Sequence, residues 1–176
     1  MEAIIGIGAN AGCREQGIAR ACSLIEQRIG AILLSPVYET LPLLHPEVPT
    51  PGQPEFLNAV AVVESRLGAH EIMATLLSIE TELGRKRGDD ILPWSARPID
   101  LDLLAFGELV LVDDGLVLPH PRLHQRDFVL RPLADLCPNW THPVTGQKVE
   151  EMLAAVDQTI LRRFHAPKNS DSIATL

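Results

Sequence analysis

The chain has 176 residues, a hydrophobic fraction of 46% and a formal net charge of −8, which suits one globular domain with a single core. The acidic charge argues against a nucleic acid or an anionic membrane as partner, because both favour basic protein surfaces. No apolar run is long enough to span a bilayer, and no signal-peptide pattern is present. Three sparse cysteines without metal-finger spacing are typical of a reducing cytoplasm.

The predicted strands and helices form a recognisable order. Apolar runs bounded by turn residues indicate strands, and apolar residues three or four apart indicate helices. In chain order we expect a strand at 1–8, a helix at 18–29, strands at 31–40 and 56–64, a helix at 72–83, the strand that contains Asp100, a hairpin at Gly107 with a strand near 109–112, and a helix at 149–156. This order predicts an α+β protein with a ferredoxin-like antiparallel sheet. Residues 1–164 are expected to form the domain, and residues 165–176 a flexible tail.

The segment 97–104 contains the most informative pattern, because charged and apolar residues alternate there with period two. Such alternation predicts a strand buried on one face, with Asp100 and Asp102 side by side on the other. Two carboxylates this close repel each other unless a cation lies nearby, and Mg²⁺ is the natural hard cation for one or two carboxylates. The alternative is an edge strand with exposed acids between buried leucines.

Basic residues gather between positions 85 and 131, which hold seven of the fifteen in the chain. This clustering favours a small polyphosphate ligand bound locally, whereas eight acids in the same window would also allow a surface of ion pairs. The run 85–87 ends a predicted helix and could simply pair with the helix dipole. His120 lies between two prolines, which suits either a phosphate contact or a rigid turn.

Aromatic residues make up only 4% of the chain. The pattern alone places Phe56 and Phe128 in the core. Asn58 is unusual in an apolar strand, and its buried amide needs partners that a flat heterocycle could provide. His142 is expected on the surface.

Together these segments resemble the 6-hydroxymethyl-7,8-dihydropterin pyrophosphokinases of folate synthesis. The resemblance runs in family order from residue 4 to about residue 145, and the segments that carry it are 5–10, 35–40, 53–60, 84–87, 97–102 and 119–133. It implies a three-layer α-β-α arrangement on the ferredoxin-like core. The loops at 41–52 and 88–96 are longer than in compact members.

The resemblance also implies an activity and a site. The enzyme would transfer the pyrophosphoryl group of ATP to the hydroxymethyl group of the pterin, using two Mg²⁺ ions held by Asp100 and Asp102 and giving AMP. Its partners would be these small molecules, and the chain is expected to be a cytoplasmic monomer. The implied residues are Arg85, Arg97, Asp100 and Asp102 for catalysis, Glu80, Arg87, Leu103, His120 and Arg126 for the nucleotide, and Thr40, Pro42, Leu43, Phe56, Asn58, Trp94 and Phe128 for the pterin.

Two alternatives remain open from the residues alone. A strand with two aspartates also serves metal-dependent nucleotidyl transfer, which releases pyrophosphate rather than AMP. A ferredoxin-like module could instead bind a pterin or a nucleotide without catalysis.

Overall fold

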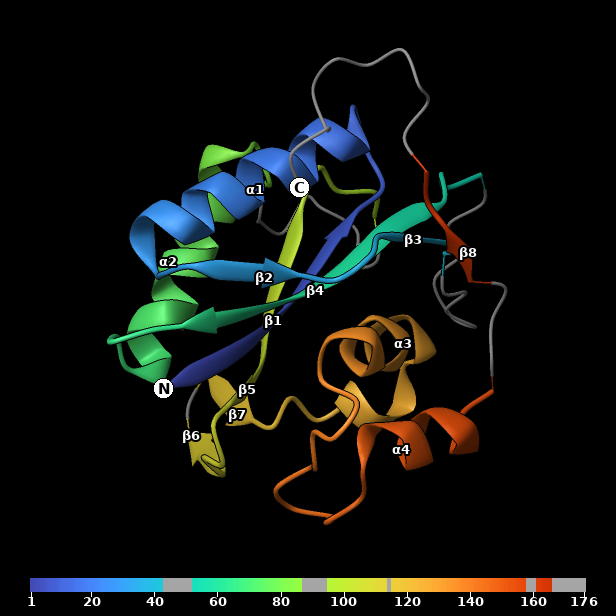
Figure 1. The fold of residues 1–176 in the computed structure, drawn as a ribbon. Coiled ribbons are helices and arrows are strands. Elements are labelled where there is room, and N and C mark those ends of the chain that lie inside the picture. The colour runs from blue at the N-terminus through green and yellow to red at the C-terminus, as the bar shows by residue number, and fades with distance from the viewer. Residues whose placement is uncertain (43–51, 87–94, 114, 158–160, 166–176) are drawn as a thin grey trace.

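The computed structural model describes residues 1–42, 52–86, 95–113, 115–157 and 161–165. It forms strands and helices in the order expected for the ferredoxin-like fold, with additions at the C-terminal end (Figure 1). The elements are β1 (Glu2–Ala9), α1 (Arg14–Arg28), β2 (Ile32–Leu34), β3 (Tyr38–Thr40), β4 (Phe56–Glu64), α2 (Ala69–Glu82), β5 (Asp100–Phe106), β6 (Leu111–Asp113), β7 (Leu116–Leu118), a 3₁₀ turn (Leu123–Gln125), α3 (Asp127–Leu136), α4 (Val149–Ala155) and β8 (Arg162–Arg163).

The main sheet has the strand order β5-β1-β4-β3-β8, and β2 also pairs with β4. Every pairing in it is antiparallel. The long strand β4 therefore receives β2 along one half and β3 along the other. This topology confirms the predicted α+β class and ferredoxin-like sheet.

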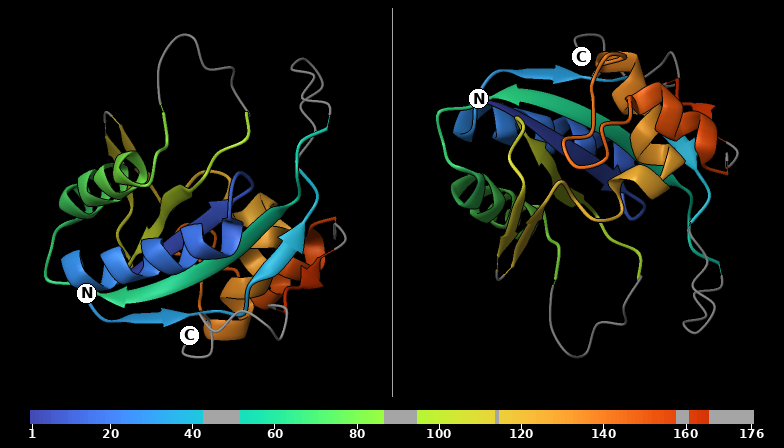
Figure 2. Two further views of the ribbon diagram at one scale, coloured as in Figure 1. Left: turned by 90° about the horizontal axis from the view of Figure 1, so that it is seen from above. Right: turned by 90° about the horizontal axis from the view of Figure 1, so that it is seen from below.

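Helices cover both faces of the sheet, as the three-layer expectation requires (Figures 1 and 2). Alternate residues of β1 face opposite layers. Ile5 and Ile7 join the core beneath α1 and α2, whereas Ile4 joins a second core beneath α3 and α4. Cys22 on α1 is buried in the first core. We call the sheet surface that faces α3 the α3 face.

The predicted strand at 31–40 is wrong as a single element, because it is interrupted between β2 and β3. Pro36 has no backbone N–H for a ladder, and Ser35 uses its side chain instead. The backbone N–H of Ser35 donates to the Val60 carbonyl at 2.9 Å, and Val60 N–H donates to Ser35 Oγ at 3.0 Å. The strand bends here without leaving these groups unpaired.

The C-terminal half differs most from the expectations. The antiparallel pair is β6–β7, in which Leu111 lies opposite Leu118, so the hairpin turn falls after Asp113 and not at Gly107. The helix α3 was not predicted, since Pro132 lies inside it and polar residues precede it. His142 was expected on the surface but is 5% exposed, and its Nδ1 accepts the backbone N–H groups of residues 144 and 145 at 3.3 Å.

No helix within the described ranges is long and apolar enough to cross a bilayer. Of the tail expected from residue 165, only His165 belongs to the described part of the chain.

Candidate functional site

The site lies on the α3 face, where three strands bring unlike residues side by side. In β1, Gly8 pairs with Asn58 of β4 on one side and with Asp100 of β5 on the other. Directly opposite residues of antiparallel strands point to the same face. A β-carbon at Gly8 would lie 3.0 Å from Asn58 Oδ1. The glycine therefore leaves room for the Asn58 side chain at the floor of the site. A role for Gly8 could not be predicted from the sequence, because its partners on β4 and β5 depend on the strand register.

A cavity opens above this floor. Its walls combine an amide, a hydroxyl, aromatic rings, carboxylates and guanidinium groups, all contributed by elements that converge on the α3 face. The lining includes Gly6, Gly8, Thr40, Leu41, Pro42, Gln53, Phe56, Asn58, Arg97, Asp100, Asp102, Leu104, Arg126, Phe128 and Val129. Such a mixture of apolar wall and few convergent polar groups is typical of a small-molecule site.

The two phenylalanines line this cavity, and Phe128 also packs against the second core, so the core location that the pattern alone predicted holds only in part. Both are half-buried. The Arg97 guanidinium lies 5.9 Å from the Phe56 ring centroid, and the Arg126 guanidinium lies 5.6 Å from that of Phe128. Each ring therefore has one cationic neighbour at cation–π distance. Phe56 comes from β4 and Phe128 from the first turn of α3. The cavity therefore lies between a sheet wall, which includes Phe56, and a helix wall, which includes Phe128.

Asn58 is buried, as its position in an apolar strand suggested. Its Nδ2 donates to Thr40 Oγ1 at 2.8 Å, so the neighbouring strand β3 supplies one partner within the protein. This bond orients the amide at the cavity floor. Thr40 and Pro42 line the same cavity, whereas Leu43 lies outside the described residues.

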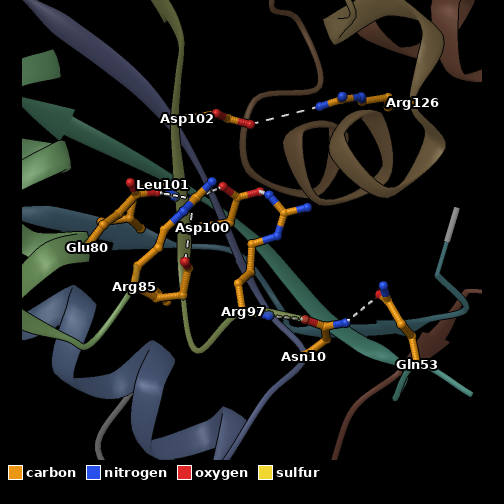
Figure 3. A network of polar contacts seen from close by, with 10 residues as sticks. Asn10, Gln53, Glu80, Arg85, Arg97, Asp100, Leu101, Asp102 and Arg126 are labelled. Atoms are coloured by element: carbon orange, nitrogen blue, oxygen red, sulfur yellow. Dashed lines mark hydrogen bonds and ion pairs between the residues drawn. The ribbon is translucent and has the colours of Figure 1, made fainter. Parts of the chain in front are cut away.

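Beside the cavity, Glu80, Arg85, Asp100 and Arg97 form a network of ion pairs, and Asp102 and Arg126 form a separate pair (Figure 3). Asp100 contacts Arg85, and its Oδ2 lies 3.2 Å from Arg97 Nη1. The Arg85 guanidinium also pairs with Glu80 Oε1 at 2.5 Å. Arg85 therefore lies between two carboxylates, one at the base of the network and one at its surface. The more remote Asp102 Oδ2 lies 3.9 Å from Arg126 Nη1.

Glu80, which the resemblance places near the nucleotide, lies at the base of this network. Its side chain is 1% exposed, and Oε1 also accepts the backbone N–H of Leu101 at 2.7 Å. The carboxylate thus connects α2 to β5 and holds Arg85 from below. Leu103 is buried in the first core, beneath α1 and α2, and its side chain does not line the cavity. Arg87 and Trp94 lie outside the described residues.

The charges in this region perturb one another. Burial raises the pKa of Asp102, and the Asp100 carboxylate raises it further. Burial lowers the pKa of Arg126 and of His120, although Asp102 opposes both shifts. For Arg85 the order is reversed: burial alone would lower its pKa, but attraction to Asp100 and Glu80 raises it. The ionised form of Asp102 is therefore disfavoured here, and a cation beside it would relieve that cost.

The same pair of aspartates fits a hard divalent cation in its donor atoms. Asp100 and Asp102 offer carboxylate oxygens, the ligands that Mg²⁺ prefers, and Mg²⁺ commonly uses only one or two protein carboxylates. Within the ranges that the structure describes, His, Cys, Asp and Glu residues form no group of three or more that could hold a metal. The donor set therefore suits an open site completed by water or phosphate and not a closed structural one.

His120 lies close enough to Asp102 for the two to influence each other's pKa. Its backbone N–H donates to the Leu104 carbonyl at 2.8 Å, which fixes the segment to β5. Its Nδ1 accepts the backbone N–H of Arg122 at 3.1 Å. One ring nitrogen of His120 is therefore used within this turn.

Sequence reasoning also gave Asn10 and Gln53 no role in the site. Asn10 is fully buried; its Oδ1 accepts the Arg97 backbone N–H at 2.8 Å, and its Nδ2 donates to Gln53 Oε1 at 3.1 Å (Figure 3). This amide joins the segment that carries Arg97 to the segment that precedes Phe56. A polar residue directly after an apolar strand was the available signal.

A ferredoxin-like sheet, a mixed cavity on one face and an adjoining acid–arginine network together define an α+β domain for a small anionic or phosphorylated ligand. Residues 4–138 match the family described as 7,8-dihydro-6-hydroxymethylpterin-pyrophosphokinase (HPPK). The chain therefore belongs to this family.

Individual relatives agree with that assignment. The pyrophosphokinase of Bacillus subtilis is 32% identical over 151 residues, which cover 85% of this chain and 86% of that protein. The corresponding protein of Porphyromonas gingivalis is 39% identical over 141 residues, which cover 79% and 92%. The mitochondrial folate synthesis bifunctional protein of Arabidopsis thaliana is 39% identical over 138 residues, and the match covers 77% of this chain but only 23% of that longer protein.

The fold has solved counterparts. A crystal structure of wild-type Plasmodium falciparum HPPK-DHPS with SDX-DHP superposes with a TM-score of 0.66 at 15% identity, and covers 88% of this chain and 43% of that one. At this identity the likeness supports the fold alone.

Proposed function

We propose that this chain transfers the pyrophosphoryl group of ATP to the hydroxymethyl group of 6-hydroxymethyl-7,8-dihydropterin, in a Mg²⁺-dependent reaction that gives AMP. The observation that carries the proposal is the register across β1. There, Asn58 and Asp100 flank Gly8 on one face, so a ring-binding amide and a phosphate-side carboxylate share one cavity floor.

The pterin fits the part of the cavity that lies between the sheet wall and the helix wall. Its flat ring would stack between Phe56 and Phe128, and its donor and acceptor edge would meet the Asn58 amide. Thr40 would hold that amide in orientation through the 2.8 Å hydrogen bond, with Pro42 beside it. The resemblance adds Leu43 and Trp94 to this pocket.

The phosphates would occupy the side of the cavity that carries Asp100, Asp102 and the arginines. When bound to the two aspartates, Mg²⁺ supplies neutralisation of the phosphate charge. Arg85 and Arg97 now contact Asp100. Both guanidinium groups would also bind phosphate oxygens, which they match in geometry and charge. The arginines would then orient the chain of phosphates and stabilise charge that develops during transfer.

The residues of the nucleotide group take different roles. His120 and Arg126 lie beside Asp102 and would contact phosphates from that side. Glu80 would act through Arg85, by holding its guanidinium in place from the buried end. The resemblance also assigns Arg87 and Leu103 to the nucleotide, and the buried side chain of Leu103 leaves its backbone as the contacting part.

We further propose that residues 1–164 form one catalytic domain that works as a cytoplasmic monomer on small molecules and not on nucleic acids or membranes. The net charge of −8 supports the choice of partners. The free thiols of Cys13, Cys22 and Cys137 support a reducing compartment. Light scattering coupled to size-exclusion chromatography tests the oligomeric state, and a dimer peak would refute that part.

The reaction is tested by mixing the purified chain with ATP, Mg²⁺ and 6-hydroxymethyl-7,8-dihydropterin and separating the nucleotides. We expect AMP to appear in step with loss of the free pterin, and to depend on both Mg²⁺ and the pterin. Release of pyrophosphate would indicate nucleotidyl transfer instead. Binding of the pterin without any turnover would indicate a non-catalytic module.

A further inference from the structure

A hydrogen-bonded cluster connects the sheet wall of the cavity to the helix α3. Tyr38, the only tyrosine in the chain, is 8% exposed. Its hydroxyl donates to Asp135 Oδ2 at 2.5 Å, and Arg131 Nη2 donates to Asp135 Oδ1 at 2.8 Å. One carboxylate on α3 is thus held from both oxygens, and the partner on the sheet side is a buried phenol.

The sheet end of this cluster is directly beside the ring-binding floor. Tyr38 pairs in register with Asn58, and Thr40 pairs with Phe56. These four side chains therefore point to the α3 face as neighbours on two strands. A displacement of the Tyr38 side chain would therefore occur directly beside the Asn58 amide that lines the cavity.

At the helix end of the cluster, Asp135 lies on the same side of α3 as Phe128, the aromatic residue of the helix wall. Asp135 follows Phe128 by seven residues, which is nearly two full turns and about 10 Å along the axis. The two residues therefore lie on the same side of α3. The apolar contacts of Val129 and Leu130 with the second core hold the helix down but are not directional. The hydrogen bond to Tyr38 is directional, so it adds a restraint on the rotation of α3 about its own axis.

We propose that Tyr38 is a positioning residue that sets the width of the ring-binding cavity through Asp135 and the rotation of α3. This inference rests on the proposed pterin function and extends it to a residue that does not line the cavity. Without the hydroxyl, a helix rotation of about 20° would move a side chain at the helix surface by about 2 Å. A shift of this size at Phe128 is enough to spoil stacking of a flat ring against Phe56.

The test compares two variants that each lose one buried hydroxyl. Tyr38→Phe keeps the ring and its packing. Ser65→Ala is the matched control, because Ser65 Oγ donates to the Ile29 carbonyl at 3.1 Å at the far end of β4. Calorimetry measures the Kd of 6-hydroxymethylpterin and of a non-hydrolysable ATP analogue for each variant. Hydrogen exchange at the amides of α3 provides a readout that needs no ligand.

We expect the pterin Kd of Tyr38→Phe to rise about tenfold, close to the lower end of what one hydrogen bond to a charged group contributes. The Kd of the ATP analogue stays unchanged, and the amides of α3 exchange faster. Ser65→Ala lowers the melting temperature but leaves both Kd values and the exchange of α3 unchanged. In a double-mutant cycle the losses in Tyr38→Phe and Asp135→Ala should be less than additive, because both changes remove the Tyr38–Asp135 hydrogen bond and only the second also removes the contact with Arg131.

Two results would overturn the inference. The first is wild-type pterin affinity in Tyr38→Phe, and the second is an equal loss in Tyr38→Phe and Ser65→Ala, which would reduce the hydroxyl to a general contribution to stability. If the wild-type chain itself does not bind the pterin, the proposed function fails. The exchange of α3 then decides the positioning role by itself, and unchanged exchange in Tyr38→Phe contradicts it.

Discussion

Replacement of Phe128 by alanine tests whether this ring belongs to a binding site or to the core. The ring lines the cavity and is half-buried, with the Arg126 guanidinium 5.6 Å from its centroid. Stacking of a flat heterocycle on an aromatic side chain contributes about 1–3 kcal/mol. Since each 1.4 kcal/mol corresponds to a factor of ten, the pterin Kd of Phe128→Ala should rise about 5-fold to 150-fold.

The effect of the same change on folding should be small by comparison. Phe106, which is 6% exposed within the first core, provides the matched control. A Phe→Ala change at such a core position costs about 3–5 kcal/mol of stability. The half-buried Phe128 should cost clearly less. Urea unfolding of Phe128→Ala and Phe106→Ala compares the two free energies of unfolding directly.

Calorimetry with the pterin and with a non-hydrolysable ATP analogue completes the test of Phe128. The account predicts a loss confined to the pterin. Equal losses of affinity for both ligands, together with a stability loss as large as that of Phe106→Ala, would refute it and return Phe128 to the core.

Three further predictions concern charge. Asp102→Asn should abolish turnover yet keep or raise the melting temperature without Mg²⁺, because it removes a buried carboxylate whose ionised form is disfavoured; near-normal turnover at saturating Mg²⁺ would remove Asp102 from the metal site. Arg85→Ala should lower kcat by up to about 10³-fold, as for other arginines that stabilise phosphoryl transfer, with a smaller rise in KM; steady-state kinetics that show an unchanged kcat would contradict this. Burial lowers the pKa of His142 below its unfolded value of about 6.5, so the unfolded chain binds more protons there and stability falls as the pH drops below that value. His142→Asn keeps an acceptor for the neighbouring backbone N–H groups, and urea unfolding at pH 7 and pH 5.5 should therefore show a weaker pH dependence than in the wild type; equal dependence would count against the buried histidine.

The parts of the fold that follow from local patterns were predictable. The alternation around Asp100 and Asp102 predicted β5 and the orientation of its first half, where Leu101 and Leu103 enter the first core. From Leu104 on, both faces of the strand are buried, which the alternation did not predict. The periodicity of Ile72, Leu76 and Ile79 likewise predicted α2, which the structure extends to Ala69–Glu82. The order of these elements then indicated the ferredoxin-like sheet.

Other features depend on contacts between distant residues and were not predictable from local pattern. Nothing in the sequence near Gly8 states that Asn58 and Asp100 flank it, since the register of two different strand pairs determines this. The burial of Glu80 beneath Arg85 likewise arises only when α2 docks on β5. The helix α3 was not predicted because Pro132 disfavours a helix in this segment, although Val129 and Leu133 are spaced as on one face of a helix.

The central claim concerns which atoms of ATP move, and an isotope label follows them most directly. ATP that carries ³²P at the β-phosphate is incubated with the chain, Mg²⁺ and 6-hydroxymethyl-7,8-dihydropterin, and the products are separated. The account predicts that the label appears in the pterin product and that the AMP formed is unlabelled. Label retained in ADP, which marks single phosphoryl transfer, or label released as free pyrophosphate would contradict it.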